Sequence, residues 1–184
     1  MFIQTEATPN PATLKFLPGS AVMESGTANF TVSDEAARSP LAQRLFAIEG
    51  VAGVFLGNDF ITATKFPDTD WDILKPRILS AIMDHYTSGD PVVNADAMEN
   101  AHAQNDDQDA LVAQICELLD TRVRPAVAQD GGDIMFKGFE NGIVYLTMQG
   151  ACAGCPSSSA TLKHGIENML KYYIPEILEV RAAE

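Results

Sequence analysis

The sequence is poor in basic residues and in cysteine. Only 12 Lys and Arg stand against 25 Asp and Glu, so the formal net charge is −13. Such an acidic surface repels a phosphate backbone, which argues against nucleic acid as a direct partner. The three cysteines, Cys116, Cys152 and Cys155, are few and odd in number, unlike a secreted disulfide framework. Free thiols indicate a reducing compartment, either cytosol or an equivalent matrix.

Long apolar runs are also missing from the sequence. No stretch approaches the roughly 20 apolar residues that a membrane-spanning helix needs, so we expect no membrane partner. The first residues, MFIQTEATPN, lack the basic and apolar regions of a signal peptide and the Arg-rich pattern of a transit peptide. We therefore expect a cytoplasmic protein if the source is bacterial, or a mature mitochondrial matrix form if it is eukaryotic.

One break in composition divides the chain. Residues 88–108 contain five acidic residues, no Lys or Arg, and little apolar periodicity. Such a segment buries too little apolar surface to offset the entropy lost on ordering, so it is predicted to be a flexible acidic linker. A solvated helix inside a single domain is the other interpretation. With a linker, residues 1–87 and 109–184 form two domains that we expect to move independently.

Both flanking regions show mixed helix and strand patterns, which indicates an α/β (α+β) fold class with two small domains. The first is predicted to contain strands at 2–6, 12–17 and 29–32, a helix at 40–48, a hairpin at 51–56 and 60–65, and a helix at 71–86 that becomes regular only near Pro76. The second is predicted in α-β-β-α-β order. Its elements are a helix of about four turns from 111 that Pro125 kinks, a hairpin at 134–139 and 143–148, a helix at 156–172 and a strand at 177–181.

The motif that carries chemistry is Gly150-Ala151-Cys152-Ala153-Gly154-Cys155-Pro156, between a predicted strand and helix. Two thiols three positions apart can bind one metal ion or one edge of a cluster. A helix start lowers the pKa of a thiol and favours an anionic ligand, and glycines let the backbone approach bulky sulfide. Cys152 and Cys155 are therefore the candidate metal-binding and cofactor-binding residues.

Four other interpretations of this motif compete with a cluster. A thiol–disulfide oxidoreductase also carries C-x-x-C at a helix start, but after the central strand of a larger sheet. A zinc site needs two further ligands, and His164 lies over two helical turns beyond Cys155. In that case the protein would be an adaptor whose first domain binds partners. The G-x-nucleophile-x-G form at 150–154 resembles a hydrolase elbow, but the chain is too short for that fold. The last interpretation is two buried structural thiols.

The number of thiols favours a shared cluster. An iron–sulfur cluster usually has four thiolate ligands, whereas one chain offers two at this position. Two chains related by a two-fold axis offer four, which predicts a homodimer bridged by the cluster. A cluster with two ligands per subunit near solvent is releasable by ligand exchange, as a carrier requires.

With these motifs in view, the chain resembles the Nfu family of iron–sulfur cluster carriers. Residues 109–184 resemble the NifU-like C-terminal domain through Arg124-Pro125, Asp130-Gly131-Gly132-Asp133, and Cys152 to Ser159 followed by Thr161-Leu162-Lys163. Residues 1–87 resemble the Nfu N-terminal domain through Gln4-Thr5-Glu6, Thr8-Pro9-Asn10-Pro11, Leu14-Lys15-Phe16 and Asp59-Phe60-Ile61-Thr62. The resemblance covers nearly all of the chain outside the predicted linker.

The resemblance implies a function without catalytic turnover, so the protein is not expected to be an enzyme. It implies a [4Fe–4S] cluster bound by a dimer through Cys152 and Cys155, although [2Fe–2S] could use the same four thiolates. It also implies delivery of the cluster to apo-acceptors such as lipoyl synthase or aconitase-like enzymes, which presupposes an upstream cluster donor. Cys116 lies outside the family motif.

Several other residues have simpler expected roles. The Asp130–Asp133 segment is predicted to end a helix, with support for the cysteine loop as the alternative. His85 and His102 are expected at the surface, Cys116 as a partly buried thiol, and the carboxylates around Trp71 as helix caps. Phe66 and Trp71 are expected in the core or at a domain contact.

Overall fold

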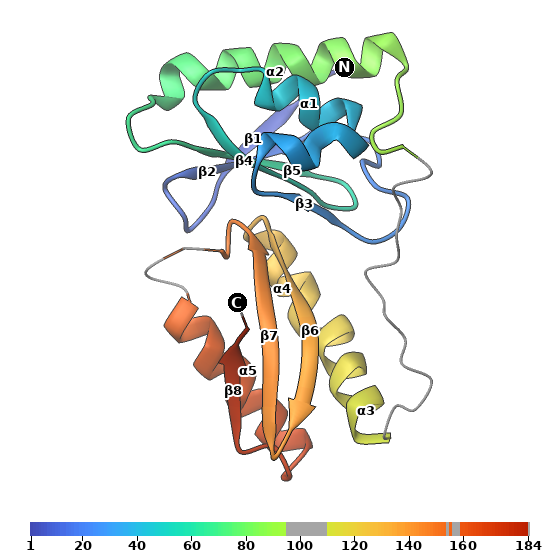
Figure 1. Cartoon of the computed structure of the whole chain (residues 1–184), viewed down its shortest axis with the longest axis vertical. Helices are drawn as coiled ribbons and strands as arrows, with labels where there is room; N and C mark the ends of the chain where they lie inside the picture. Colours follow the sequence, from blue (N-terminus) through green and yellow to red (C-terminus); the bar gives the residue numbers. More distant parts are fainter. Residues whose placement is uncertain (95–109, 154, 156–158, 184) are drawn as a thin grey trace.

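The computed structural model describes residues 1–94, 110–153, 155 and 159–183. Its helices and sheets form two α+β units, which confirms the predicted fold class (Figure 1). Most of the expected linker, and His102 with it, lies outside the described residues. The domain boundaries at 87 and 108 therefore stay predictions. No helix in the described part of the chain is long and apolar enough to cross a membrane.

The N-terminal unit is a five-stranded antiparallel sheet with helices on one face (Figure 1). The strand order is β1-β2-β5-β4-β3, with bounds β1 Gln4–Ala7, β2 Thr13–Leu17, β3 Ala28–Phe30, β4 Val51–Leu56 and β5 Ile61–Lys65. The helices are a 3₁₀ segment η1 Ser33–Arg38, α1 Pro40–Phe46 and α2 Trp71–Ser88. Alternate residues of β4 and β5, such as Val54 and Ala63, face the helices and form the core with Leu74 and Ile78.

Capping side chains start both α-helices. The Ser39 hydroxyl accepts from the Ala42 N–H before α1, and the Asp70 carboxylate accepts from the Asp72 N–H before α2. Helix α2 is regular from Trp71 and runs through Pro76, so the expectation of a later start is wrong. The reason is position: Pro76 lies in the second turn, where only one backbone hydrogen bond is lost.

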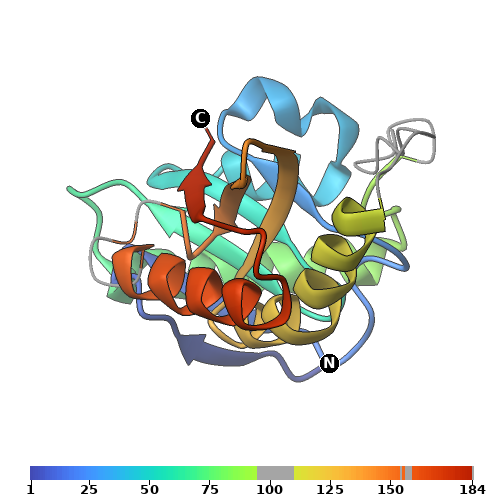
Figure 2. The same cartoon turned by 90° about the horizontal axis from the view of Figure 1, so that it is seen from below.

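The C-terminal unit comprises helices and a three-stranded sheet in the order β6-β7-β8. Its elements are α3 Ala110–Leu118, a π-helical turn η3 Leu119–Val123, α4 Arg124–Gln129, β6 Gly132–Glu140, β7 Ile143–Gly150, α5 Ser159–Tyr173 and β8 Glu179–Ala182. Strands β6 and β7 form the predicted hairpin, turned by Asn141 and Gly142 at φ of 52° and 80°. Helix α5 crosses from β7 to the parallel strand β8, and Figure 2 shows α5 beside the α3–α4 segment.

Two single-residue expectations fail in the N-terminal unit. His85 is fully buried, because the α2 face that carries it packs inward. Phe66 is 53% exposed instead of lying in the core. Trp71 does pack against the core cluster, as expected, and its indole N–H donates to the Pro11 carbonyl. Beyond α2, residues 89–94 stay on the unit: Arg44 pairs with Asp90, and the Ser39 hydroxyl donates to the Val92 carbonyl.

Candidate metal centre

The two candidate ligands lie in the loop between β7 and α5. Cys152 is 4% exposed and Cys155 is 1% exposed. The loop begins at Gly150, whose φ of 64° turns the chain out of β7. The next residue, Ala151, donates its N–H to the Gly131 carbonyl. The cysteine loop, residues 150–155, is therefore tied to the segment that joins α4 to β6.

The glycine pair at the junction of α4 and β6, Gly131 and Gly132, has both roles that the sequence suggested for it. Gly131 has a φ of 80° and closes α4 by donating its N–H to the Ala128 carbonyl. Gly132 forms the seat of Cys152: a Cβ at position 132 would lie 2.6 Å from the Cys152 Sγ and 2.7 Å from the Gln149 carbonyl oxygen. Any side chain at 132 would thus displace the cysteine loop.

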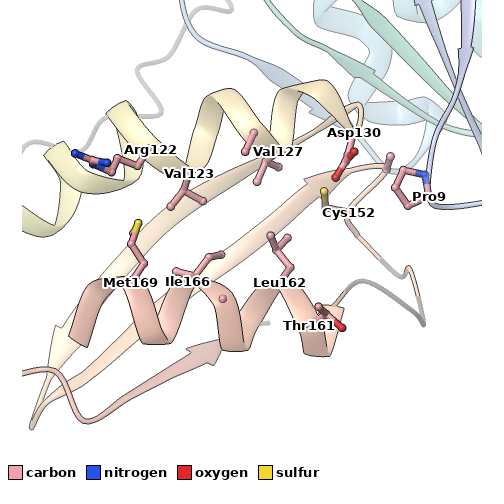
Figure 3. A pocket seen from close by; sticks show the side chains of 13 residues that line it. Pro9, Arg122, Val123, Val127, Asp130, Cys152, Thr161, Leu162, Ile166 and Met169 are labelled. Atoms are coloured by element: carbon pink, nitrogen blue, oxygen red, sulfur yellow. The ribbon is translucent and has the colours of Figure 1, made fainter. Parts of the chain in front are cut away.

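A groove of about 550 Å³ opens beside Cys152, between the η3–α4 segment and α5 (Figure 3). Cys152 lies at the end next to Asp130 and Pro9, and Arg122 lies at the opposite end (Figure 3). The walls between them are mostly apolar: Val123, Val127, Leu162, Ile166 and Met169. One candidate ligand therefore borders space that is open to a bound group.

The electrostatics of the loop differ from the sequence expectation of a lowered thiol pKa. Burial raises the pKa of Cys152 to about 12, and the negative charges of Asp130, Cys155 and Asp133 add to the effect. The described part of α5 begins only at Ser159, so the expected helix start at Pro156 lies outside the described residues. In this conformation Cys152 is a neutral thiol.

Hydrogen bonds join the N-terminal unit to the cysteine loop. The Cys155 Sγ donates to the Pro9 carbonyl oxygen at 3.5 Å, and the Asn10 side-chain amide donates to the Ala151 carbonyl oxygen at 3.3 Å. Pro9 and Asn10 form the turn between β1 and β2. From the sequence they were identified only as a turn and as part of a family motif. Nothing local in the sequence could have indicated a partner 141 residues away.

The remaining candidates stay apart from this site. Cys116 is partly buried on α3, as expected, and burial followed by the Asp120 charge raises its pKa. His164 is exposed on α5. Across the described ranges, no three His, Cys, Asp or Glu side chains gather in a group that could hold a metal ion. The described part of one chain therefore offers the thiol pair without a third ligand.

Comparisons with known proteins place both units in known families. Residues 3–89 match the family described as the scaffold protein Nfu/NifU N terminal, and residues 115–181 match the NifU-like domain. The NFU1 iron-sulfur cluster scaffold homolog, mitochondrial, of Homo sapiens is 54% identical over 178 residues, which span 96% of this chain and 70% of that protein.

Two further proteins are similar to this chain. NifU-like protein 5, mitochondrial, of Arabidopsis thaliana is 56% identical over 182 residues, covering 96% of this chain and 66% of its own length. This chain thus spans about two thirds of that relative. Among solved structures, a NifU-like protein from Saccharomyces cerevisiae aligns with a TM-score of 0.47 and 29% identity, over 52% of this chain and 86% of its own.

Proposed function

The chain belongs to the Nfu family of iron–sulfur cluster scaffold proteins, and from this premise we propose that it holds a [4Fe–4S] cluster at a homodimer interface and passes the cluster to apo-acceptor proteins. Cys152 and Cys155 are the ligands in this proposal. The protein acts as a scaffold without catalytic turnover, and the cluster is its cargo.

The observation that carries the proposal is the packing of the loop that holds the two thiols. Both cysteines lie in one loop whose start, Gly150, packs against Gly131 and Gly132. Gly132 leaves room for the Cys152 Sγ against the backbone, so the loop holds this sulfur at a position that any side chain at 132 would block. Thiolates are the usual protein ligands of iron–sulfur clusters, so the donor set fits the cargo.

The number of donors supports the dimer. Two thiols per chain make four in a two-fold pair, the usual ligand count of a [4Fe–4S] or a [2Fe–2S] cluster. Because each subunit contributes only half of the ligands, an acceptor can replace them stepwise with its own thiolates. This chemistry suits transfer to apo-enzymes such as lipoyl synthase or aconitase-like proteins, after loading by an upstream cluster donor.

The site of action follows from the same chemistry. Free thiols persist in reducing compartments, which include the cytosol and the mitochondrial matrix. The names of the two curated relatives both contain the word mitochondrial, which supports the matrix alternative over the cytoplasmic one. We therefore propose the matrix as the working location if the source is eukaryotic.

Anaerobic reconstitution with iron and sulfide tests the proposal. We expect about four iron and four sulfide per dimer, the content of one [4Fe–4S] cluster. The double variant Cys152→Ala, Cys155→Ala should lose the cluster and the dimer together. Cys116→Ala, the matched control, should keep both, because Cys116 lies outside the loop.

Two results would contradict the proposal. A double variant that stays as brown as the parent would place the ligands elsewhere. Disulfide reduction by iron-free protein, lost in the same double variant, would favour the thiol–disulfide oxidoreductase instead.

A further inference from the structure

The N-terminal sheet has a second face that its own helices do not cover. Lys15, Thr62 and Phe55 form one row across β2, β5 and β4, because Thr62 is the register partner of both others. Their neighbours along the strands face α1 and α2, so this row points the other way. All three are nevertheless buried, with exposures of 7%, 1% and 1% in the order named. Another part of the molecule must therefore cover this face.

The cover is the C-terminal unit. Strands β4 and β5 lie against β7, and Figure 1 shows the β6–β7 hairpin meeting the sheet at the end that carries the cysteine loop. A Cβ at Gly150 would lie 3.1 Å from the Phe55 ring, and a Cβ at Gly131 would lie 2.9 Å from the Thr62 methyl group. The two glycines thus let the loop lie directly on the sheet.

Polar contacts hold the same interface together. The Lys15 ammonium donates to the carbonyls of Ala128 and Gln129 at 3.0 and 3.2 Å. A cation at these last carbonyls of α4 is favoured by the negative end of the helix dipole. On the other side, the Thr27 hydroxyl donates to the Asp133 carboxylate at 2.8 Å.

The contacts continue onto the candidate ligands. The β1–β2 turn places the Pro9 carbonyl against Cys155 and the Asn10 amide against Ala151. Cys152 still borders the groove, but Cys155 is 1% exposed beneath this turn. A group shared with a second subunit has to reach both sulfurs from outside the chain. Docking of the N-terminal unit is incompatible with that access.

Building on the proposed function, we propose that this sheet face is a docking surface for the chain's own cysteine loop, and that the docked form is a closed state of the apo-protein. Opening exposes Cys152 and Cys155 together and precedes binding of a cluster that a second subunit shares. Lys15 is the main electrostatic contact of the closed state, and the sheet face becomes free for other proteins only after opening.

The composition of the interface suits reversible docking. The Thr62 hydroxyl is buried with no hydrogen-bond partner among the described residues, which opposes closure. Lys15 loses most of its hydration when it docks, and this cost offsets part of the gain from its two hydrogen bonds. Some contacts therefore stabilise the closed state and others oppose it. A ligand can shift such an equilibrium between closed and open states, because neither state is strongly favoured.

Thiol reactivity in the full-length apo-protein tests the closed state. Lys15→Glu places a carboxylate at the carbonyl end of α4, where it repels the dipole in the closed form only. Lys75→Glu is the matched control, since Lys75 lies on α2 at the other face of the sheet. Alkylation by iodoacetamide is followed at each cysteine by mass spectrometry, and Cys116 is the internal reference.

We expect Lys15→Glu to accelerate alkylation of Cys152 and Cys155 by about tenfold or more, because the rate follows the open fraction. Alkylation of Cys116 should not change, and Lys75→Glu should react like the parent. Circular dichroism of both variants checks that the fold is intact. Parent protein that is alkylated at Cys155 as fast as Lys15→Glu would overturn the closed state.

The consequence for loading is measured separately. Dimer formation during anaerobic reconstitution should be faster in Lys15→Glu than in Lys75→Glu. Faster alkylation with an unchanged rate of dimer formation would overturn the requirement for opening. Failure of the proposed function looks different: the double cysteine variant would keep its cluster, whereas the alkylation result on apo-protein would stand.

Discussion

His85 is a buried base in the core of the N-terminal unit, at a position where the sequence indicated a surface residue. It is fully buried on α2, and among the described residues neither ring nitrogen has a hydrogen-bond partner. Burial lowers the pKa of His85 below its ordinary 6.5, the nearby Arg44 charge lowers it further, and Asp90 opposes the shift. The folded unit therefore holds a neutral imidazole.

This burial predicts acid sensitivity with a definite sign. Because the unfolded chain binds the proton more readily, the stability from neutral His85 is complete above pH 6.5 and is lost as the pH falls toward the lower folded-state pKa. The slope for one such group is at most about 1.4 kcal/mol per pH unit. Urea unfolding of the N-terminal unit between pH 8 and 5 should show this loss in the parent and less of it in His85→Leu.

The control for this prediction is His164→Leu, because His164 is an exposed histidine on α5. Urea unfolding of the N-terminal unit in His164→Leu should match that in the parent. An equal acid dependence in the parent and in His85→Leu would show that other groups cause the loss.

The cysteine loop shows how far single residues could be interpreted from the sequence. The thiol pair, its glycines and its place between a strand and a helix are adjacent in the chain, so local rules identify them. The raised pKa of Cys152 depends on Asp130 and Asp133, and its seat depends on Gly132. Those residues reach the loop only through the pairing of β6 with β7, which no local pattern encodes.

At the level of elements, the first turn of α2 provides a direct test of capping. Asp70 satisfies the Asp72 N–H at the helix start, as the sequence predicted for the carboxylates near Trp71. Asp70→Ala should lower the free energy of unfolding of this unit by about 1 kcal/mol, since the N–H loses its acceptor. Asp70→Asn should keep most of the capping contribution to the free energy of unfolding. Asp68→Ala, in the exposed loop before the helix, should change this free energy little. Equal urea midpoints for Asp70→Ala and Asp68→Ala would refute the capping role.

The helix before the glycine pair shows why element shape was harder to predict than element presence. Its apolar period indicated one helix of about four turns with a kink at Pro125. Instead, α3 passes into the π-helical turn η3, and α4 then begins at Arg124 with Pro125 in its first turn. Proline cannot donate to the carbonyl one turn earlier, and the wider π turn is one way to relieve that mismatch. The missing donor was predictable, but the choice of π turn over kink was not.

On the scale of the whole molecule, the two units have separate cores and one shared surface. Each hydrophobic cluster draws residues from its own half of the chain, and the N-terminal cluster includes Val92 and Val93 from the segment predicted as linker. The shared surface was not predicted, because the acidic segment suggested two independently moving domains. Phe55 and Phe60 reveal the shared surface in the structure: both are buried, yet neither belongs to the N-terminal core cluster. A large apolar side chain on the outer face of a half-covered sheet indicates a further partner.

Separate cores joined by a docked surface predict a directional coupling between the units. Ile78 is fully buried in the N-terminal core, so Ile78→Ala should cost that unit about 2 to 5 kcal/mol through lost contacts and a cavity. Hydrogen exchange in intermediate urea should then show early loss of protection in β4 and β5 but retained protection in β6 and β7. Under the same conditions, alkylation of Cys155 should rise, because the unfolded N-terminal unit no longer supplies the Pro9 turn that covers it.

Ile73→Ala, at a side chain that is 61% exposed, should change neither readout. Simultaneous loss of protection in both sheets would mean that the two units unfold as one, and retained protection of Cys155 would mean that its burial does not depend on docking.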